Sequence, residues 1–311
     1  MKRRSFVTTL SAAMAVAASR KLQPSMTVRA ADADGWHVST NSYVWGTFAR
    51  RDGKSFGNDW ENDLQQVVKG GMDGFEPGIG SVAQLDEIAD WLQRRGLEMR
   101  SMYVGTQLHE ADGLDERINH VIQLAERARA LCGTSIVVNN PAPMGGGEAK
   151  NDDQLGIQRN ALERLGRGLR AVDMTLAYHN HDVELRHGAR EFHHMLAGSD
   201  PEAVSFCLDA HWVYRGCGNS QAALFDVVEL YADRIVELHL RQSQDGVWTE
   251  AFVPGDIDYE RLGRELEERG IRPLLVLEQA VEAATPHTMN AVEAHLASED
   301  YLRRCFGWME S

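Results

Sequence analysis

Residues 176–185 read LAYHNHDVEL, a short apolar stretch that runs into several potential metal ligands. Alternate residues of a β-strand face the same side, so His179 and His181 are expected to point together. Asp182 and Glu184 follow them and add oxygen donors at the carboxyl end of the predicted strand. Divalent metals bind such groups, although two hydrogen-bonded histidines at a strand end would also explain this stretch alone. The rest of the chain decides between the two interpretations.

Three later apolar stretches also end in a residue that can bind a metal, namely Asp209, His239 and Glu278. An acidic side chain at the end of an apolar strand costs free energy unless it is paired or bound to a metal. A single residue of this kind needs no special explanation. A potential ligand at each of four successive strand ends is hard to explain by packing, so the pattern favours one shared polar site.

The order of apolar and amphipathic segments predicts the fold. Eight predicted strands alternate with eight predicted helices, which is typical of parallel strands joined by helical crossovers. Eight such units form a closed (β/α)8 TIM barrel, so we expect residues 31–311 to be a single barrel domain. The predicted strands span residues 36–42, 72–76, 97–103, 134–139, 175–181, 203–209, 234–240 and 273–278, and the predicted helices span residues 60–68, 82–95, 114–131, 153–172, 190–196, 221–232, 259–269 and 287–304.

An open, doubly wound α/β sheet is the alternative fold for such an alternation. Its phosphate-binding turn, G-x-G-x-x-G, is absent from the sequence. The glycines at 145–147 follow a predicted strand, but they are more typical of a flexible loop than of a phosphate-binding turn. No Pro/Gly/Ser-rich linker divides the chain, and the closed barrel is therefore the preferred prediction.

Composition and charge exclude several classes of function. The chain has 311 residues, of which 43% are hydrophobic and 25% charged, as in globular proteins with a sizeable core. The formal net charge of −14 becomes −20 without residues 1–30, because these carry six basic and no acidic side chains. Such an acidic surface repels phosphate backbones, so no nucleic-acid partner is expected. The four cysteines lack C-x-x-C spacing, which argues against a zinc ribbon or a disulfide scaffold.

The first thirty residues resemble an export signal. Lys2, Arg3 and Arg4 precede an apolar run from residue 6 to residue 19, and the string RRSF is similar to twin-arginine signals. The run is short for a membrane span, and small residues at 28–31 or 15–18 offer cleavage sites. We therefore predict a periplasmic or secreted protein exported by the twin-arginine route, with no stable membrane insertion after cleavage. An uncleaved membrane anchor is the alternative.

Five segments together resemble the xylose isomerase-like TIM barrel family, also described as sugar phosphate isomerases/epimerases. They are LAYHNHDVEL, VSFCLDAHWV at 204–213, RIVELHL at 234–240, PGDIDYERL at 254–262 and LLVLEQA at 274–280. The resemblance covers essentially the whole mature chain and implies one divalent metal ion, Mn, Mg or Zn, as cofactor. It also implies that this ion is held by the residues that end strands five to eight, which are His179, Asp209, His239 and Glu278.

The active site of a (β/α)8 barrel forms where the strands end and the βα loops begin. Candidate catalytic bases at such positions are Glu278, His181 and Glu76. His181 could instead support a metal ligand, and Glu76 could instead bind substrate hydroxyl groups. The candidate substrate-binding residues are His211, Trp212, Arg241, Tyr103 and Asn139.

Two positions depart from the family pattern. Many epimerases of the family have a glutamate where this chain has His179, and a lysine is often found where it has Arg241. The first change removes one of two carboxylates that act on opposite faces of the sugar. Arginine stays protonated and is a poor general base, although it can clamp a carboxylate, a phosphate or an enolate. The resemblance therefore does not carry over the full two-carboxylate epimerase mechanism.

Together these observations predict a metal-dependent isomerase or epimerase that acts on a sugar or keto-sugar through an enediolate. A lyase or dehydratase that eliminates a β-substituent is the main alternative. An abasic-site endonuclease of the same fold would need additional metal-binding histidines and a basic face, and a non-catalytic sugar-binding barrel is the remaining class. The expected partner is a small-molecule sugar, and a homo-oligomer is compatible with the sequence.

Overall fold

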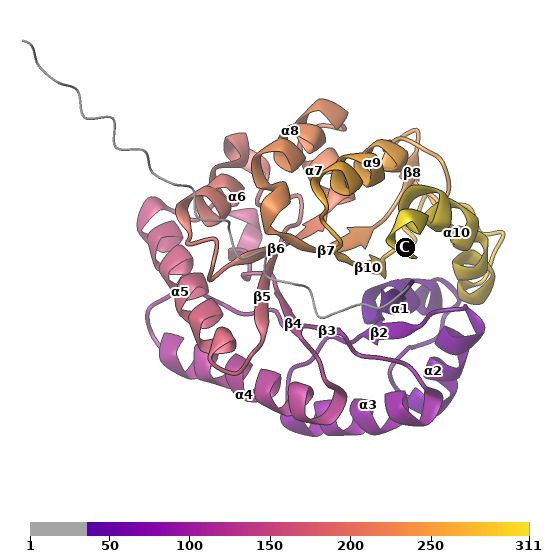
Figure 1. The fold of residues 1–311 in the computed structure, drawn as a ribbon, viewed down its shortest axis with the longest axis horizontal. Coiled ribbons are helices and arrows are strands. Elements are labelled where there is room, and N and C mark those ends of the chain that lie inside the picture. Colours follow the sequence, from indigo (N-terminus) through magenta and orange to yellow (C-terminus); the bar gives the residue numbers. More distant parts are fainter. Residues whose placement is uncertain (1–35, 311) are drawn as a thin grey trace, which may run out of the picture.

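The structure, a computed structural model, describes residues 36–310. The predicted signal peptide of residues 1–30 and its cleavage sites lie outside the described residues. Within them, eight parallel strands form a barrel with helices around it, as Figure 1 shows. The predicted TIM barrel fold is confirmed.

The barrel strands are short, and each is parallel to its hydrogen-bonded neighbours. Their order is β2-β1-β10-β7-β6-β5-β4-β3. Between β2 and β3 the barrel closes through isolated bridges that join Gly74 to Glu98 and Gly78 to Tyr103. The strands are β1 Val38–Asn41, β2 Gly74–Glu76, β3 Ser101–Tyr103, β4 Ile136–Asn139, β5 Thr175–His179, β6 Ser205–Asp209, β7 Ile235–Leu240 and β10 Leu274–Leu277.

All the predicted helices are present, and side-chain caps fix where several of them begin. Side-chain oxygens of Asp59, Ser81, Asn151 and Asn290 accept backbone N–H groups at the amino ends of four of them. Each helix buries an apolar face against the barrel. These helices are α2 Trp60–Lys69, α3 Val82–Arg95, α4 Leu114–Cys132, α5 Asp152–Arg170, α6 Arg186–Gly198, α8 Gln221–Tyr231, α9 Tyr259–Arg269 and α10 Ala291–Phe306.

Several short elements were not predicted. They are the helices α1 Ser42–Arg51 and α7 Ala210–Gly216, and a hairpin of β8 Ser243–Gln244 and β9 Val247–Trp248. Both helices begin directly after a strand, where Asn41 accepts the N–H of Val44 and Asp209 accepts the N–H of Trp212. Because the last strand residue also caps the helix, no loop composition marks these starts in the sequence.

Apolar packing forms a large cluster under the helices and a small cluster inside the barrel. In β7, Ile235 and Leu238 belong to the outer cluster, whereas Val236 belongs to the inner one. The register between β6 and β7 shifts beside Phe206 and Cys207, which is a β-bulge. A bulge adds one residue to a strand and re-aims the side chains that come after it. The side chains on the interior face of β7 therefore depart from strict alternation.

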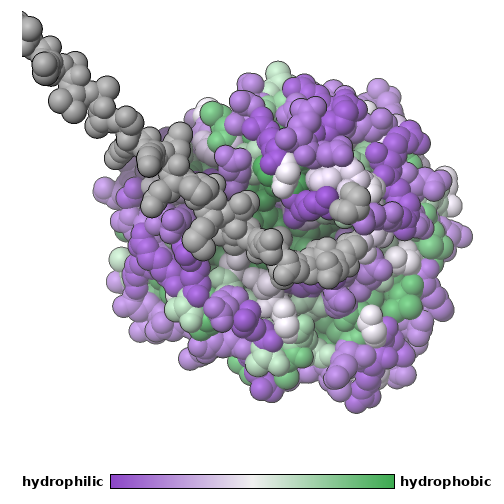
Figure 2. Space-filling view, viewed as in Figure 1, coloured by the Kyte–Doolittle hydropathy of each residue, from purple (hydrophilic) through white to green (hydrophobic). Residues whose placement is uncertain are grey.

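Hydrophilic residues cover much of the helical rim on the face shown in Figure 2. None of the helices within residues 36–310 is long and apolar enough to cross a membrane. All four cysteines are free of disulfide bonds.

Candidate metal centre and active site

Four side chains from neighbouring strands converge at the carboxyl end of the barrel. His179 ends β5, Asp209 ends β6, His239 lies in β7 and Glu278 directly follows β10. One donor atom of each lies within 4.8 Å of the donor atoms of the others, and all four residues are buried. The register pairs Asp209 with His239 across β6 and β7. The structure thus brings together the four residues that the family resemblance implied as metal ligands.

These residues fit a divalent ion because each has a buried donor atom that lacks a hydrogen-bond partner within residues 36–310. Among the described residues, no hydrogen-bond partner is found for Nδ1 of His179, Oδ2 of Asp209, Nδ1 of His239 or Oε2 of Glu278. His239 Nδ1 lies 2.6 Å from Glu278 Oε2, but without the geometry of a hydrogen bond. Buried polar atoms normally have partners, and two carboxylates with two imidazoles can balance and coordinate a divalent cation.

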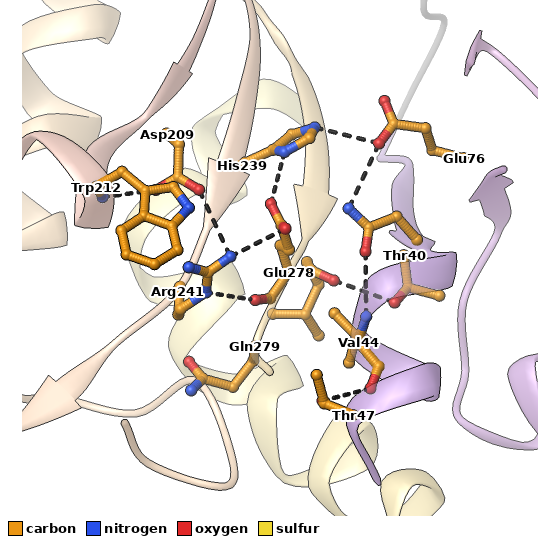
Figure 3. Close-up of polar contacts among 12 residues, drawn as sticks. Thr40, Val44, Thr47, Glu76, Asp209, Trp212, His239, Arg241, Glu278 and Gln279 are labelled. Atoms are coloured by element: carbon orange, nitrogen blue, oxygen red, sulfur yellow. Dashed lines mark hydrogen bonds and ion pairs between the residues drawn. The ribbon is translucent and has the colours of Figure 1, made fainter. Parts of the chain in front are cut away.

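Neighbouring groups hold both carboxylates in place. Asp209 Oδ1 accepts the Trp212 N–H at 2.8 Å, and Arg241 Nη2 lies 2.9 Å from Glu278 Oε1. Arg241 Nε also donates to the Glu278 carbonyl oxygen at 3.0 Å, and its Nη2 lies 3.6 Å from Asp209 Oδ2 (Figure 3). Each carboxylate therefore has one oxygen held by a contact shorter than 3 Å, while its other oxygen lacks a hydrogen-bond partner among the described residues and could bind a metal.

Arg241 lies behind the ligands and is completely buried. Its guanidinium packs 4.9 Å from the Trp212 ring centre and 4.4 Å from that of Trp248. Burial alone would lower the pKa of Arg241, but Glu278 and Asp209 raise it above its usual value. Conversely, burial would raise the pKa of Glu278, but Arg241 and His239 lower it to about 2. Arg241 was expected to contact substrate, whereas the structure pairs it with the ligand carboxylates.

A cavity of about 410 Å³ opens above the ligand cluster. Of the residues predicted to act at the site, Glu76, His181, Tyr103 and Trp212 line it together with His179 and Glu278. The other residues of its wall are Asn41, Ser42, Tyr43 and Gly78. The cavity wall therefore holds two of the four potential metal ligands, all three candidate bases and three aromatic side chains.

His181 lies in the loop after β5, because this strand ends two residues earlier than predicted. Glu184 holds the loop, since its Oε2 accepts the His181 N–H at 2.8 Å and its Oε1 accepts from Asn140 Nδ2 at 3.3 Å. The imidazole packs edge-on against the rings of His179 and Trp212. Burial lowers the pKa of His181 to about 4, so the ring is neutral near pH 7.

Glu76 is buried at the end of β2 and has contacts for both carboxylate oxygens. Its Oε1 accepts from Asn41 Nδ2 at 3.4 Å and lies 3.3 Å from His239 Nε2 (Figure 3). Its Oε2 accepts from Ser101 Oγ at 3.1 Å. Both carboxylate oxygens of Glu76 therefore already have protein partners at the cavity wall.

Two predicted substrate-binding residues lie away from the cavity wall. Asn139 Nδ2 donates to the Val104 carbonyl at 2.5 Å and to Thr106 Oγ1 at 3.0 Å, so its amide ties the end of β4 to the segment after β3. His211 is buried against the rings of Trp212 and Trp248, and burial lowers its pKa to about 2. Neither side chain lines the cavity.

Sequence patterns also missed residues of this site. Tyr43 is 42% exposed at the cavity mouth, and it went unnoticed because α1 follows β1 without a loop. Glu237 lies two residues before His239 and contacts it from inside the barrel. Its acidic side chain in an otherwise apolar strand was the signal that could have identified it. Glu76, Glu237 and His239 form a second group of potential ligands, as do His179, Cys207 and His239, and both groups share His239 with the four-residue cluster.

Comparison with known proteins agrees with the fold. The profile of the family described as xylose isomerase-like TIM barrel matches residues 64–305. An inosose dehydratase from Serratia proteamaculans is 25% identical over 284 residues, covering 79% of this chain and 91% of the relative.

Solved structures share the architecture at lower sequence identity. A D-allulose 3-epimerase from Methylomonas sp. in complex with D-allulose has a TM-score of 0.64 and 13% identity, covering 88% of this chain and 98% of the other. A xylose isomerase-like TIM barrel protein from Mycobacterium smegmatis in complex with magnesium has a TM-score of 0.63 and 15% identity, with coverage of 88% and 98%. The profile match spans most of the chain, and the protein therefore belongs to the xylose isomerase-like TIM barrel family.

Proposed function

We propose that the protein is a divalent-metal-dependent enzyme that removes a proton from the carbon next to the carbonyl of a sugar or keto-sugar. The observation that carries this proposal is the convergence of four buried donor atoms, without hydrogen-bond partners in the described part of the chain, below a cavity. The same cavity presents the neutral imidazole of His181. Metal ligands and an adjacent base are the two parts that such a reaction needs.

The donor set favours manganese or zinc over magnesium. His179 and His239 supply imidazole nitrogens, while Asp209 and Glu278 supply carboxylate oxygens. Imidazole suits zinc and related transition metals, whereas magnesium prefers oxygen ligands and bound water. When bound, the ion would polarise a carbonyl and an adjacent hydroxyl group and so acidify the C–H bond between or beside them.

The cavity wall favours an uncharged substrate. Among the described residues, no lysine or arginine lines it, and Arg241 is already paired with Asp209 and Glu278. A phosphate group would therefore meet acidic and aromatic side chains without a counter-ion. Tyr43, Tyr103 and Trp212 offer ring faces for the C–H surfaces of a sugar. We therefore expect an unphosphorylated sugar, keto-sugar or related polyol.

Three residues of the cavity wall supply the proton transfer and the hydrogen bonds that this reaction needs. His181 accepts the proton from carbon, and return of that proton to the neighbouring carbon gives isomerisation. Epimerisation instead requires a second group to deliver a proton to the opposite face of the same carbon. Burial raises the pKa of Tyr103 far above its usual value, so its hydroxyl stays protonated and can donate a hydrogen bond. Glu76 accepts hydrogen bonds from substrate hydroxyl groups. We place isomerase or epimerase activity first on this arrangement.

A dehydratase is the second candidate function, and the similarity to an inosose dehydratase over most of both chains favours it. The initial proton removal would be the same. Elimination additionally needs a proton for the departing hydroxyl group, which protonated His181 can supply so that the group leaves as water. The Tyr103 hydroxyl on the cavity wall can orient that group by a hydrogen bond. The two candidates therefore share the first step and differ in the second, which is either return of the proton to carbon or departure of a hydroxyl group.

Incubation with Mn²⁺ in deuterated water tests both candidates against a panel of keto-sugars and inososes. An isomerase or epimerase should give an isomeric product that carries solvent deuterium beside the carbonyl, detected by NMR. A dehydratase should give a product that has lost water, detected by mass spectrometry. Absence of exchange and of product across the panel, with metal bound, would contradict the proposal.

The twin-arginine signal remains a proposal that rests on Arg3, Arg4 and Phe6. A reporter fused after residue 35 should reach the periplasm, and replacement of both arginines by lysine should block export. Export that continues in that variant through the general secretory route would refute this localisation.

A further inference from the structure

Glu237 occupies a position inside the barrel that packing alone does not explain. It lies in β7 two residues before His239 and is 0% exposed. Its Oε1 lies 3.1 Å from His239 Nε2, with hydrogen-bond geometry, and 3.9 Å from Cys207 Sγ. Its Oε2 has no hydrogen-bond partner among the described residues. A carboxyl group is thus buried with His239 as its principal partner.

The backbone accounts for the direction of both side chains. The β-bulge between β6 and β7 pairs Phe206 with Ile235 and Cys207 with Glu237, so Val236 has no partner of its own. After the bulge, Glu237 and His239 have the same strand parity and face the barrel interior. The fold therefore places a carboxylate directly behind the imidazole that faces Glu278.

We propose that Glu237 is a positioning residue that accepts the Nε2 proton of His239 and thereby holds its Nδ1 toward the metal centre. This inference rests on the proposed metal-dependent function. A histidine that binds a metal through one nitrogen commonly donates its other N–H to a carboxylate, which fixes the ring and increases its basicity. Nδ1 is the nitrogen of His239 that lies beside Glu278 Oε2 and lacks a hydrogen-bond partner in the described chain.

Glu76 also approaches His239 Nε2 but has a different role. Its Oε1 is farther away, at 3.3 Å, and this contact does not have hydrogen-bond geometry, unlike that of Glu237. Glu76 also accepts from Asn41 and Ser101 and lines the cavity, whereas Glu237 does not. The orientation of the imidazole is therefore assigned to Glu237, and the contact with substrate to Glu76.

A purely structural role is a poor explanation for Glu237. Burial of a carboxyl group with one unpartnered oxygen is unfavourable, and an apolar side chain of similar volume often serves packing as well or better. The two roles therefore predict opposite effects of an apolar replacement. If Glu237 is structural, the replacement destabilises the metal-free protein. If Glu237 is a positioning residue, stability is kept and metal affinity falls.

The test compares Glu237→Met and Glu237→Gln with the wild type in the full chain. Titration of the metal-free proteins with Zn²⁺ in a competing chelator should show that Met weakens binding roughly 10- to 100-fold. The Gln variant should lose less, because its amide oxygen can still accept the Nε2 proton. The melting temperature of metal-free Glu237→Met should equal or exceed that of the wild type.

Glu250→Gln is a matched control, because Glu250 is also buried but bonds to Arg51 and to Thr288 away from the ligands. It should lower the melting temperature and leave Zn²⁺ affinity within about twofold of the wild type. Equal affinity of Glu237→Met and wild type would overturn the inference and leave the proposed function intact. A wild type that binds no Zn²⁺ or Mn²⁺ would instead refute the proposed function.

A second measurement does not depend on any variant. Nitrogen-15 NMR of histidines in the Zn²⁺-loaded wild type distinguishes a metal-bound Nδ1 from a metal-bound Nε2. The inference predicts that His239 binds through Nδ1 and keeps its proton on Nε2, with that proton shifted by a strong hydrogen bond. Coordination through Nε2 with the proton on Nδ1 would overturn it, even if Glu237→Met failed to fold.

Discussion

Strands in both halves of the barrel end in polar residues, but the two halves differ in whether these residues have hydrogen-bond partners within the protein. In the ligand half, made of β5, β6, β7 and β10, one donor atom of each terminal residue lacks a hydrogen-bond partner within residues 36–310. In the wall half, made of β1 to β4, three of the four strands end in residues that bond to other protein groups: Asn41 to Glu76, Glu76 to Ser101, and Asn139 to Thr106. Oδ1 of Asn139 is the atom of these residues that lacks a hydrogen-bond partner in the described chain. Buried ligand atoms without a hydrogen-bond partner indicate a site for an ion. Side chains held by other protein groups form a fixed wall against which a substrate can rest.

Loss of a carboxylate in the ligand half should have the largest effect. Asp209→Asn keeps the Oδ1 that accepts the Trp212 N–H but removes the charge that faces the metal. We expect activity to fall roughly a thousandfold, since bound metal supplies several kcal/mol of stabilisation. Steady-state kinetics at saturating Mn²⁺ measure the loss. The control variant Asp226→Asn, on the exposed face of α8, should retain activity within about twofold. Similar losses of activity in both variants would show that the ligand half has no special role.

Arg241→Met tests how the ligand half is stabilised without metal. Removal of the guanidinium leaves Asp209 and Glu278 buried without their cation, and breaking a buried pair costs about 3 kcal/mol or more. The metal-free variant should therefore melt well below the wild type, and added Mn²⁺ should raise its melting temperature by more than it raises that of the wild type. Calorimetry with EDTA and with Mn²⁺ measures both shifts. Equal melting temperatures of the metal-free proteins would refute this account of Arg241.

Glu76→Gln probes the wall half. The amide keeps an acceptor oxygen toward Asn41 but lacks the charge that strengthens hydrogen bonds to substrate. We expect kcat/KM to fall roughly 10- to 100-fold while metal affinity stays within a few-fold of the wild type. Kinetics and Zn²⁺ titration of the same preparation make the comparison. If Glu76→Gln lost as much Zn²⁺ affinity as Asp209→Asn in the same titration, the two halves would not be functionally separate.

His295 gives the smallest expected effect and contrasts with the histidines of the ligand half. Its Nδ1 donates to the Ala291 carbonyl, its Nε2 lies 2.9 Å from Thr40 Oγ1, and burial lowers its pKa from 6.5 to about 4. The unfolded chain therefore takes up a proton that the folded chain refuses, so the stability present above pH 6.5 is lost as the pH falls toward 4. We expect the wild type to lose roughly 1 to 2 kcal/mol relative to His295→Gln between pH 7 and pH 5.

Urea unfolding of both proteins across this pH range checks the prediction for His295. The two stability profiles should converge as the pH falls. Parallel profiles would show that His295 does not titrate differently in the folded and unfolded states.

The fold was predictable because strands and helices differ clearly in hydrophobic period and in capping residues such as Asp59 and Asn290. The ligand residues were predictable for a related reason, since a polar residue that ends a buried strand is conspicuous in an apolar sequence. His181 shows a limit of this approach. Alternation extended β5 by two residues, whereas the chain turns after His179 and still directs the next imidazole to the cavity.

Other parts of the site depended on packing that sequence patterns do not contain. Arg241 was expected to contact substrate because it lies shortly after His239, but the rings of Trp212 and Trp248 hold it behind the ligands. Asn139 was expected in the cavity because it ends a strand, and it instead ties the end of β4 to the segment after β3. Glu237 had the same strand parity as His239, yet its role became visible only through the distance between their side chains.

Diffraction from a crystal soaked in Mn²⁺, recorded for anomalous scattering, tests the central claim most directly. We expect one strong anomalous peak for Mn²⁺ that lies about 2.0 to 2.4 Å from each of four atoms: His179 Nδ1, Asp209 Oδ2, His239 Nδ1 and Glu278 Oε2. A peak at the group formed by Glu76, Glu237 and His239 instead, or no peak within the barrel, would contradict it.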